Sequence, residues 1–138
     1  MPMDERLQLY HVLEDGSTAE TFAATLRKGG YEIELNPTAF DENRLAMVLL
    51  SDNATLEGLF AVAPWLKQQY EYCSYPHLRL MPVFVYDSRN TDPEEAFEGK
   101  VGELYEELMS GEFKPFGFDQ AKENPLEEFP RILDEYSE

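Results

Sequence analysis

The sequence predicts an α/β protein, a three-layer α/β/α sandwich in which helices cover both faces of a mostly parallel sheet of four to five strands. Residues 45–50 are all apolar and run into a serine and an aspartate, a pattern typical of a strand buried on both faces. Residues 78–86 have similar composition, and segments with helical periodicity separate the strands. We expect one domain spanning residues 1–138, long enough to bury a core without disulfides or metals.

The first segments predict a strand, a helix and a second strand. Residues 7–13 are rich in strand-forming side chains, and a short turn follows them. A helix is predicted over residues 17–28, since Ser17 and Glu20 have the spacing of a capping box and two glycines follow. Residues 31–35 alternate strictly between apolar and polar side chains, which indicates a strand with one solvated face.

The link to the third strand leaves the direction of the second strand open. Only residues 36–44 separate the two strands, whereas a parallel crossover usually needs a dozen residues or more. The link is therefore either a cramped parallel crossover or a wide antiparallel hairpin.

Two helical segments follow the third strand. Asn53 and Thr55 are alternative caps for a helix over residues 56–63, and Pro64 separates it from a more aromatic helical stretch over residues 65–73.

The last third of the chain is expected to contain one more strand and two helices. Pro82, inside the predicted strand at residues 78–86, argues for an edge position or a bulge. Residues 92–111 predict an amphipathic helix, residues 113–118 an aromatic loop, and residues 124–136 a short final helix. With right-handed crossovers the order of elements predicts a flavodoxin-like arrangement with the first and third strands in the centre.

The charge balance excludes some partners. The chain has 28 acidic and 11 basic residues, a net charge of −17, which is the wrong sign for nucleic acid or an anionic membrane surface. An acidic surface could instead attract a basic protein, although solubility alone also explains it. The chain has no apolar run of membrane-spanning length and no signal peptide, so we expect a cytoplasmic protein. Glycine-rich nucleotide motifs are absent, and no cofactor is predicted.

Acidic and hydroxyl side chains at the ends of predicted strands form a candidate ligand rim. Its members are Glu14, Asp15, Ser51, Asp52 and Asp87. Strands of an open α/β sheet place their carboxyl ends at one edge, where such a rim could bind a divalent cation or accept a phosphoryl group. Alternatively these residues are solvated loop residues and helix caps, and we therefore predict no metal site.

The remaining candidates have mostly structural interpretations. His11 and His77 are isolated, and His11 lies within a predicted strand, where packing is its usual role. Cys73 is the only cysteine, so it forms no internal disulfide, and only His77 is near enough in sequence to activate it.

An aromatic group is a candidate partner surface. It consists of Trp65, Tyr70, Tyr72 and Tyr75. Exposed aromatic side chains often anchor protein interfaces, but the same residues could fill the core beneath a loop.

Two segments resemble Toll/interleukin-1 receptor (TIR) domains. Val48-Leu49-Leu50-Ser51, followed by a helix with a tryptophan, is similar to their strand-plus-serine segment, and residues 80–85 are similar to their following strand. Residues 7–28 resemble the opening of these domains. The resemblance implies a flavodoxin-like module that self-associates in signalling, and many bacterial members cleave NAD with a glutamate in the helix after that serine.

The chain departs from the TIR pattern at two places. Residues 36–44 replace the long loop and helix that the family has there, and the usual place of the catalytic glutamate falls at about Ala63. Glu57 precedes this place and Glu71 follows it. The resemblance thus implies a reduced TIR-like domain without NAD hydrolysis.

We therefore expect a non-catalytic, TIR-like interaction module in signalling or defence that binds a protein partner or itself. The first alternative is an acidic inhibitor or immunity-type protein that binds a basic partner. The others are a TIR-type NAD hydrolase that uses a displaced glutamate and an enzyme that uses the rim around Ser51.

Overall fold

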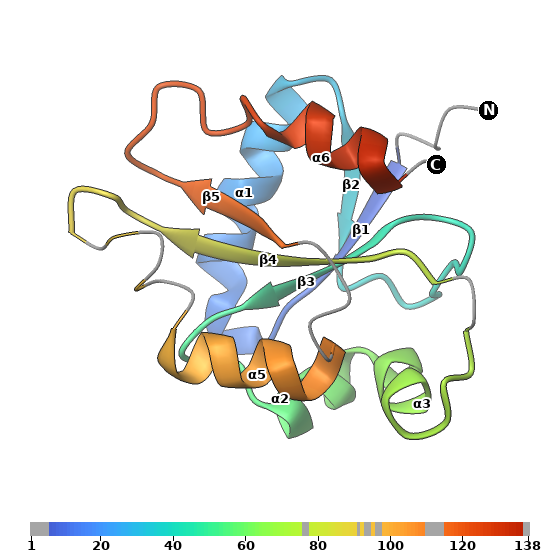
Figure 1. Cartoon of the computed structure of the whole chain (residues 1–138). Coiled ribbons are helices and arrows are strands. Elements are labelled where there is room, and N and C mark those ends of the chain that lie inside the picture. Colours follow the sequence, from blue (N-terminus) through green and yellow to red (C-terminus); the bar gives the residue numbers. More distant parts are fainter. Residues whose placement is uncertain are drawn as a thin grey trace.

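The computed structural model describes residues 6–75, 78–90, 92, 95, 98–109 and 115–136. Five strands form one all-parallel sheet in the order β2-β1-β3-β4-β5, which confirms the predicted three-layer, flavodoxin-like fold (Figure 1). In chain order the elements are β1 (Arg6–Tyr10), the 3₁₀ turn η1 (Leu13–Asp15), α1 (Gly16–Lys28), β2 (Glu32–Leu35), β3 (Ala46–Leu50), α2 (Leu56–Val62), α3 (Pro64–Tyr72), β4 (Leu80–Tyr86), α5 (Gly99–Met109), β5 (Phe116–Asp119) and α6 (Phe129–Tyr136).

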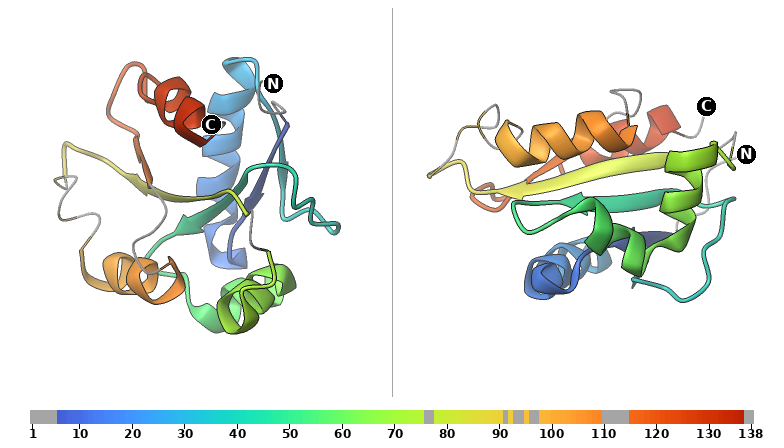
Figure 2. Two further views of the ribbon diagram at one scale, coloured as in Figure 1. Left: turned by 45° about the vertical axis from the view of Figure 1, so that its right-hand side comes forward. Right: turned by 90° about the horizontal axis from the view of Figure 1, so that it is seen from below.

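The helices form two layers, one on each face of the sheet. α1 and α6 pack on one face, and α2, α3 and α5 pack on the other. In Figure 1, α6 lies at the top of the view and α1 runs behind the sheet, whereas α2, α3 and α5 lie along the bottom; Figure 2 gives two turned views of the same arrangement. Alternate residues of β3 face the two layers: Met47 and Leu49 pack with α1 and α6, and Val48 and Leu50 pack with the other three helices. All of β3 is buried, as its continuous apolar sequence predicts.

The short link at residues 36–44 is a parallel crossover that contains no helix. β2 and β3 both pair in parallel with β1, so the link must pass across β1. Gln8 of β1 is only 4% exposed, and its side chain bonds the backbone of the link, where a crossover helix would otherwise pack. Its Nε2 donates to the backbone oxygen of Asp41 at 2.7 Å, and its Oε1 accepts from the Asp41 N–H at 3.2 Å.

An aromatic contact also holds the link. The ring of Phe40 stacks on Trp65 of α3 with 4.2 Å between centroids and 7° between planes. Tyr10 of β1 meets the same indole edge-on at 5.1 Å. The side-chain contacts of Gln8 and Phe40 thus allow a crossover shorter than the usual dozen residues.

Pro82 lies in β4, which has β3 on one side and β5 on the other. The prediction that this strand is at the edge of the sheet is therefore wrong. Pro82 pairs with Val48 of β3, and the pairing of β4 with β5 begins only at Val83. The Ala46 N–H donates to the Arg79 carbonyl, so the backbone N–H and C=O groups of odd-numbered residues in β4 point toward β3. The missing N–H of Pro82 therefore faces the other side, before β5 begins, and costs no ladder bond.

Two local predictions were wrong, and a third is confirmed. The predicted aromatic loop contains β5, which starts at Phe116. Ser17 does not cap α1, because the helix begins one residue earlier, at Gly16, and Asp15 turns inward. Thr55, however, does cap α2, since its hydroxyl accepts from the Gly58 N–H at 3.0 Å. Both ends of the helix predicted over residues 92–111 include positions outside the described residues. His77 also lies outside them.

Candidate functional site

The connections after β1 and β3 leave toward opposite faces of the sheet. β1 leads into α1 on one face, and β3 leads into α2 on the other. In open α/β sheets such a switch point opens a crevice at the carboxyl ends of the strands. A cleft of about 440 Å³ lies here and extends to the end of β4. Its lining residues are Asp15, Thr18, Leu49, Leu50, Ser51, Asp52, Asn53, Phe84, Val85, Tyr86, Asp87, Glu95, Glu98, Val101 and Gln120.

Asp15 is a carboxylate buried in the wall of this cleft, 3% exposed. The 3₁₀ turn η1 brings it there, since its N–H bonds the Val12 carbonyl at 3.0 Å while Leu13 and Glu14 face solvent. Because a 3₁₀ helix has three residues per turn, the side chains of Leu13, Glu14 and Asp15 point in three different directions, and only that of Asp15 points toward the cleft.

Two polar side chains from the loop after β3 bond the Asp15 carboxylate. The Ser51 hydroxyl donates to Oδ2 at 2.5 Å, and Asn53 Nδ2 donates to Oδ1 at 3.0 Å. The Asn53 N–H in turn donates to the Ser51 hydroxyl oxygen at 3.1 Å. The three residues form a network that joins the connections on the two faces of the sheet.

Asp52 and Asp87 lie on the more open parts of the cleft. Asp52 is exposed and forms no ion pair with any residue that the structure describes. Asp87 is paired with Arg89, whose Nη2 donates to Oδ2 at 2.6 Å. The hydrogen bonds and charge of Arg89 hold the pKa of the Asp87 carboxyl below its ordinary value.

Sequence reasoning missed Asp119, at the end of β5. Its Oδ1 accepts from the backbone N–H groups of Ser88 at 3.0 Å and Ala121 at 2.9 Å. Burial raises the pKa of Asp119, but these hydrogen bonds outweigh burial and the pKa lies below its ordinary value. The sequence offers only a short signal, since residues 116–119 alternate and end on an acid, but four residues are too few to distinguish a strand from a loop.

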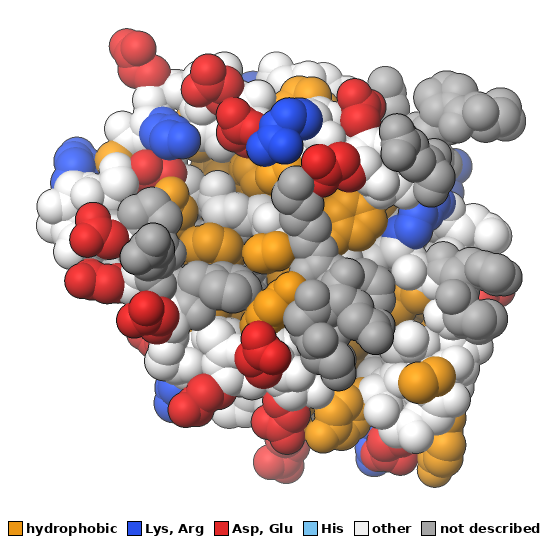
Figure 3. Space-filling view, viewed as in Figure 1, with side chains coloured by type: hydrophobic (Ala, Val, Ile, Leu, Met, Phe, Trp, Pro, Cys, Tyr) orange, Lys and Arg blue, Asp and Glu red, His pale blue; other side chains and the backbone are white. Residues whose placement is uncertain are grey.

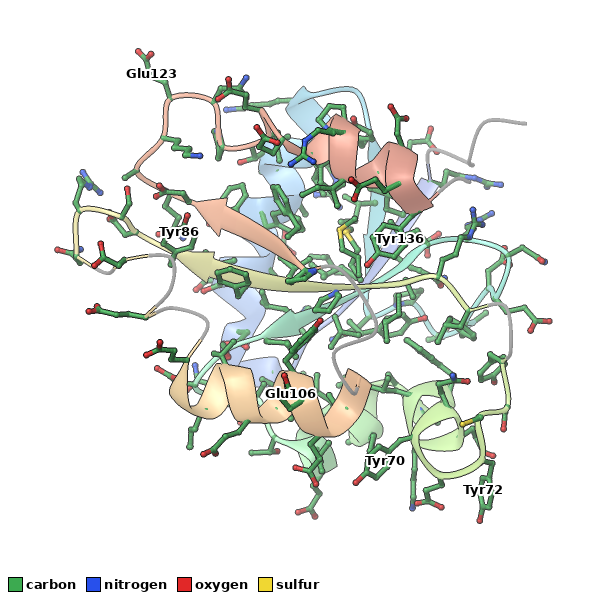
Figure 4. The ribbon with its side chains drawn as sticks, viewed as in Figure 1. Tyr70, Tyr72, Tyr86, Glu106, Glu123 and Tyr136 are labelled. Atoms are coloured by element: carbon green, nitrogen blue, oxygen red, sulfur yellow. The ribbon has the colours of Figure 1, made fainter. Side chains whose placement is uncertain are left out.

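Aromatic side chains form another part of the cleft wall. Tyr86 lies at the end of β4 (Figure 4) and stacks on Phe84, with 5.7 Å between ring centroids. Gly117 of β5 lies beneath them, and a Cβ there would be 2.9 Å from Phe84 Cζ. Burial, and next the nearby Asp119 carboxylate, raise the pKa of Tyr86.

The structure thus brings four of the five predicted rim residues to one cleft: Asp15, Ser51, Asp52 and Asp87. Glu14, the fifth, is exposed and is not part of the lining. Among the described residues, no group of three or more His, Cys, Asp or Glu side chains is arranged to hold a metal ion.

The predicted aromatic surface loses one of its members. Trp65 is 5% exposed, because Phe40 covers it, and it belongs to the core rather than to the surface. Tyr75 is half-buried, also against Phe40. Tyr70 and Tyr72 of α3 are 41% and 70% exposed and project from the molecule in Figure 4.

The other residues singled out in the sequence lie away from the cleft. His11 is buried, with Nδ1 2.7 Å from the Val12 carbonyl oxygen. Cys73 is exposed and ends α3 in a left-handed conformation, with φ of 51°. Glu57 and Glu71 lie on α2 and α3, and neither lines the cleft.

Comparison with models of known protein families found no match, and comparison with curated proteins found no significantly similar sequence. The TIR resemblance therefore stays a prediction. Within the described part of the chain, no helix combines the length and apolar character needed to cross a bilayer.

Proposed function

We propose that this protein is a non-catalytic protein-binding module that captures a basic partner through the cleft at the carboxyl ends of its strands. The observation that carries the proposal is the charge of that cleft. Among the described residues, five carboxylate side chains line it, and no lysine, arginine or histidine does. A wall of one charge focuses the field and favours a partner of the opposite charge.

The surface around the cleft has the same sign. The chain carries a net charge of −17, and acidic side chains spread over the left and lower parts of the face in Figure 3. α5 alone presents Glu103, Glu106 and Glu107 beside the cleft residue Glu98. Long-range attraction would therefore bring a basic partner toward the cleft before any contact forms.

The absence of catalysis in this proposal is supported by the side chains that the cleft contains. A base that works near neutral pH is most often a histidine, and none lines the cleft in the part of the chain that the structure describes. Glu57 and Glu71 lie outside the lining, and Glu71 is 3.8 Å from Lys67 in an ion pair. Ala63, at the usual place of the TIR glutamate, is buried.

The setting of this binding is a TIR-like role in signalling or defence, which rests on the resemblance of residues 48–51 and 80–85. The acidic cleft equally favours a second candidate, an inhibitor or immunity-type protein that blocks a basic nuclease or toxin. The two differ in outcome, since an inhibitor abolishes the activity of the protein it binds.

Charge-reversal variants test the proposal. Immobilised protein is exposed to a cell lysate and compared with the Asp52→Lys/Glu98→Lys variant and with the matched control Glu20→Lys/Glu32→Lys, whose residues are exposed on α1 and β2. We expect the wild type and the control to capture the same basic proteins, released by moderate salt, and the cleft variant to lose them. Equal capture by both variants would contradict the proposal.

A second assay addresses the enzymatic alternative. Purified protein is incubated with NAD, and released nicotinamide is measured by chromatography. We expect none above the rate without protein. Release that disappears in Glu57→Ala or Glu71→Ala would establish a hydrolase and overturn the proposal.

A further inference from the structure

We propose that His11 and Asn36 form a pH-sensitive contact, which holds the crossover link (residues 36–44) to β1 while His11 is neutral and releases it when His11 is protonated. The hydrogen bonds of the two residues carry the proposal. They determine which nitrogen of the imidazole ring bears the proton, and they place the other nitrogen against an N–H donor. The proposal does not depend on the acidic cleft.

Asn36 is attached to β1 beyond the end of the strand pairing. Its backbone N–H donates to the Leu9 carbonyl at 2.7 Å, and its φ of 45° then ends the extended course of β2. Its side-chain amide continues the contact, because Oδ1 accepts from the His11 N–H at 2.9 Å and Nδ2 donates to the His11 carbonyl at 3.0 Å. These two bonds fix the orientation of the amide, since a flipped amide would face N–H with N–H and oxygen with oxygen.

The imidazole ring of His11 has a partner at both nitrogens, and the residue is only 7% exposed. Nδ1 lies 2.7 Å from the Val12 carbonyl oxygen, which can only accept, so Nδ1 bears the proton of the neutral ring. Nε2 is then an acceptor 3.4 Å from Asn36 Nδ2, which donates to it. The neutral ring therefore satisfies all contacts between the two residues.

Protonation of His11 creates a conflict at Nε2. The protonated ring has an N–H at both nitrogens, so Nε2 would face the Asn36 NH₂ group with a donor of its own. The amide cannot turn its oxygen toward the ring without breaking both bonds to the His11 backbone. A buried N–H without an acceptor is costly, and more so when it carries charge. Release of the Asn36 side chain removes the conflict, because both groups can then bond to water.

The surroundings of His11 supply no counter-charge. Among the described residues His11 forms no ion pair. The carboxylates on the adjoining parts of the neighbouring segments are Glu14 and Asp15 of η1, Glu20 of α1, Glu34 of β2, Asp52 after β3 and Glu57 of α2. Asp15 is already bonded by Ser51 and Asn53, and the other five are exposed. The extra proton is therefore not stabilised by a salt bridge.

Release of Asn36 should open the protein next to its single tryptophan. Residues 36–38 and Phe40 of the link line a cavity of about 430 Å³, and Tyr10 and Trp65 are among its other lining residues. Because Phe40 also stacks on Trp65, a loosened link leaves the indole less covered. Histidine gains its proton between about pH 8 and pH 5, so we expect the cavity to open in this range.

Amide hydrogen exchange at residue 11 tests the proposal, because the His11 N–H donates directly to Asn36 Oδ1. Exchange is followed by NMR at about pH 7.5 and about pH 5.5, on either side of the ordinary histidine titration, and is corrected for the intrinsic effect of pH. We expect protection at residue 11 to fall roughly tenfold on acidification, as the loss of a buried hydrogen bond implies, and protection in β3 to stay unchanged. Equal protection of residue 11 at both pH values would overturn the proposal.

Two histidine variants identify the titrating group. His11→Gln keeps a polar side chain that does not titrate, so the loss of protection at residue 11 should disappear. His77→Gln changes the only other histidine of the chain and should keep the wild-type response. A response that persists in His11→Gln belongs to another group and contradicts the proposal.

Asn36→Asp should reverse the direction of the effect. A carboxylate at this position accepts from the protonated ring in a charge-assisted hydrogen bond, so acidification should increase protection at residue 11 instead of reducing it. A merely structural role of Asn36 predicts no such reversal, and a loss of protection like that of the wild type would count against the pairing of the two side chains.

Acrylamide quenching of Trp65 is a second readout, which also serves if Asn36→Asp folds poorly. Quenching should increase on acidification in the wild type and in His77→Gln, and it should stay constant in His11→Gln. Constant quenching in the wild type would show that the link remains closed, which contradicts the proposal.

Discussion

The Ser51 hydroxyl donates a hydrogen bond to Oδ2 of Asp15 over 2.5 Å, although the two residues lie 36 positions apart. Asp15 belongs to the connection that leads onto one face of the sheet, and Ser51 belongs to the connection that leads onto the other. The bond therefore connects the loop that leads to α1 on one face with the loop that leads to α2 on the other, at the switch point where these loops diverge. It also shapes the wall of the cleft.

Removing this donor should destabilise the protein. Ser51→Ala leaves one oxygen of a buried carboxylate without its partner, so we expect the free energy of unfolding to fall by about 1–3 kcal/mol. Ser17→Ala is the control, because the Ser17 side chain is exposed and does not cap α1. Urea denaturation of both variants measures the difference, and equal midpoints would contradict the structural role of Ser51.

The crossover between β2 and β3 depends on Gln8. Gln8→Leu preserves much of the volume but leaves the N–H and carbonyl of Asp41 without their partner, so we expect a loss of about 1–3 kcal/mol in unfolding free energy. Hydrogen exchange at residues 36–44 should accelerate more than exchange in β3. The exposed Gln68→Leu is the matched control, and the prediction fails if it has the same effect.

The single tryptophan reports directly on the core. Because Phe40 stacks on Trp65 and leaves it 5% exposed, we expect blue-shifted emission and weak quenching by iodide. Phe40→Ala should shift the emission to the red and increase quenching while the far-ultraviolet circular dichroism stays unchanged. Strong quenching in the wild type would instead favour the exposed aromatic surface expected from the sequence.

Two glycine substitutions should have opposite effects. In Gly117→Ala the new Cβ would lie 2.9 Å from Phe84 Cζ and 3.3 Å from Tyr86 Cε1, so the rings must move and we expect a loss of about 1–3 kcal/mol. Gly16→Ala meets open space in helical conformation and should stabilise by about 0.4–1 kcal/mol. Thermal denaturation measures both, and a stabilising Gly117→Ala would show that the rings tolerate the methyl group.

Asp119 should contribute to the loss of stability in acid. Burial acts to raise its pKa, but the Ser88 and Ala121 hydrogen bonds lower it below the ordinary value of 3.8, so the unfolded chain takes up a proton at higher pH than the folded protein. The stabilisation is therefore complete above pH 3.8 and is lost as the pH falls through the lower, folded-state value. Unfolding free energies of Asp119→Asn should depend less on pH in this range than those of the wild type.

A matched variant completes this measurement. Glu20→Gln also removes one carboxylate, but from an exposed position on α1. We expect it to follow the wild-type pH dependence. If Asp119→Asn does so as well, the hydrogen bonds to Asp119 do not contribute to the acid transition.

The sequence alone was sufficient for the fold class, because that information is local. The apolar run of β3 has no polar residue to face solvent, so it requires cover on both faces and hence a three-layer structure. The Thr55 cap and the strand at residues 80–86 follow equally from short-range patterns. Four rim residues share one cleft, since parallel strands end at the same edge.

Only the tertiary structure decided the features that depend on distant partners. The parallel direction of β2 appears only in its pairing with β1, where Gln8 bonds the link at Asp41, 33 positions away, and Trp65 is covered by Phe40 of that same link. β5 is too short for its periodicity to distinguish it from a loop, and its pairing with β4 is what makes Phe116–Asp119 a strand. Hydrogen bonds and ring contacts between residues far apart in the chain leave no periodic pattern, so they appear only once the sheet has assembled.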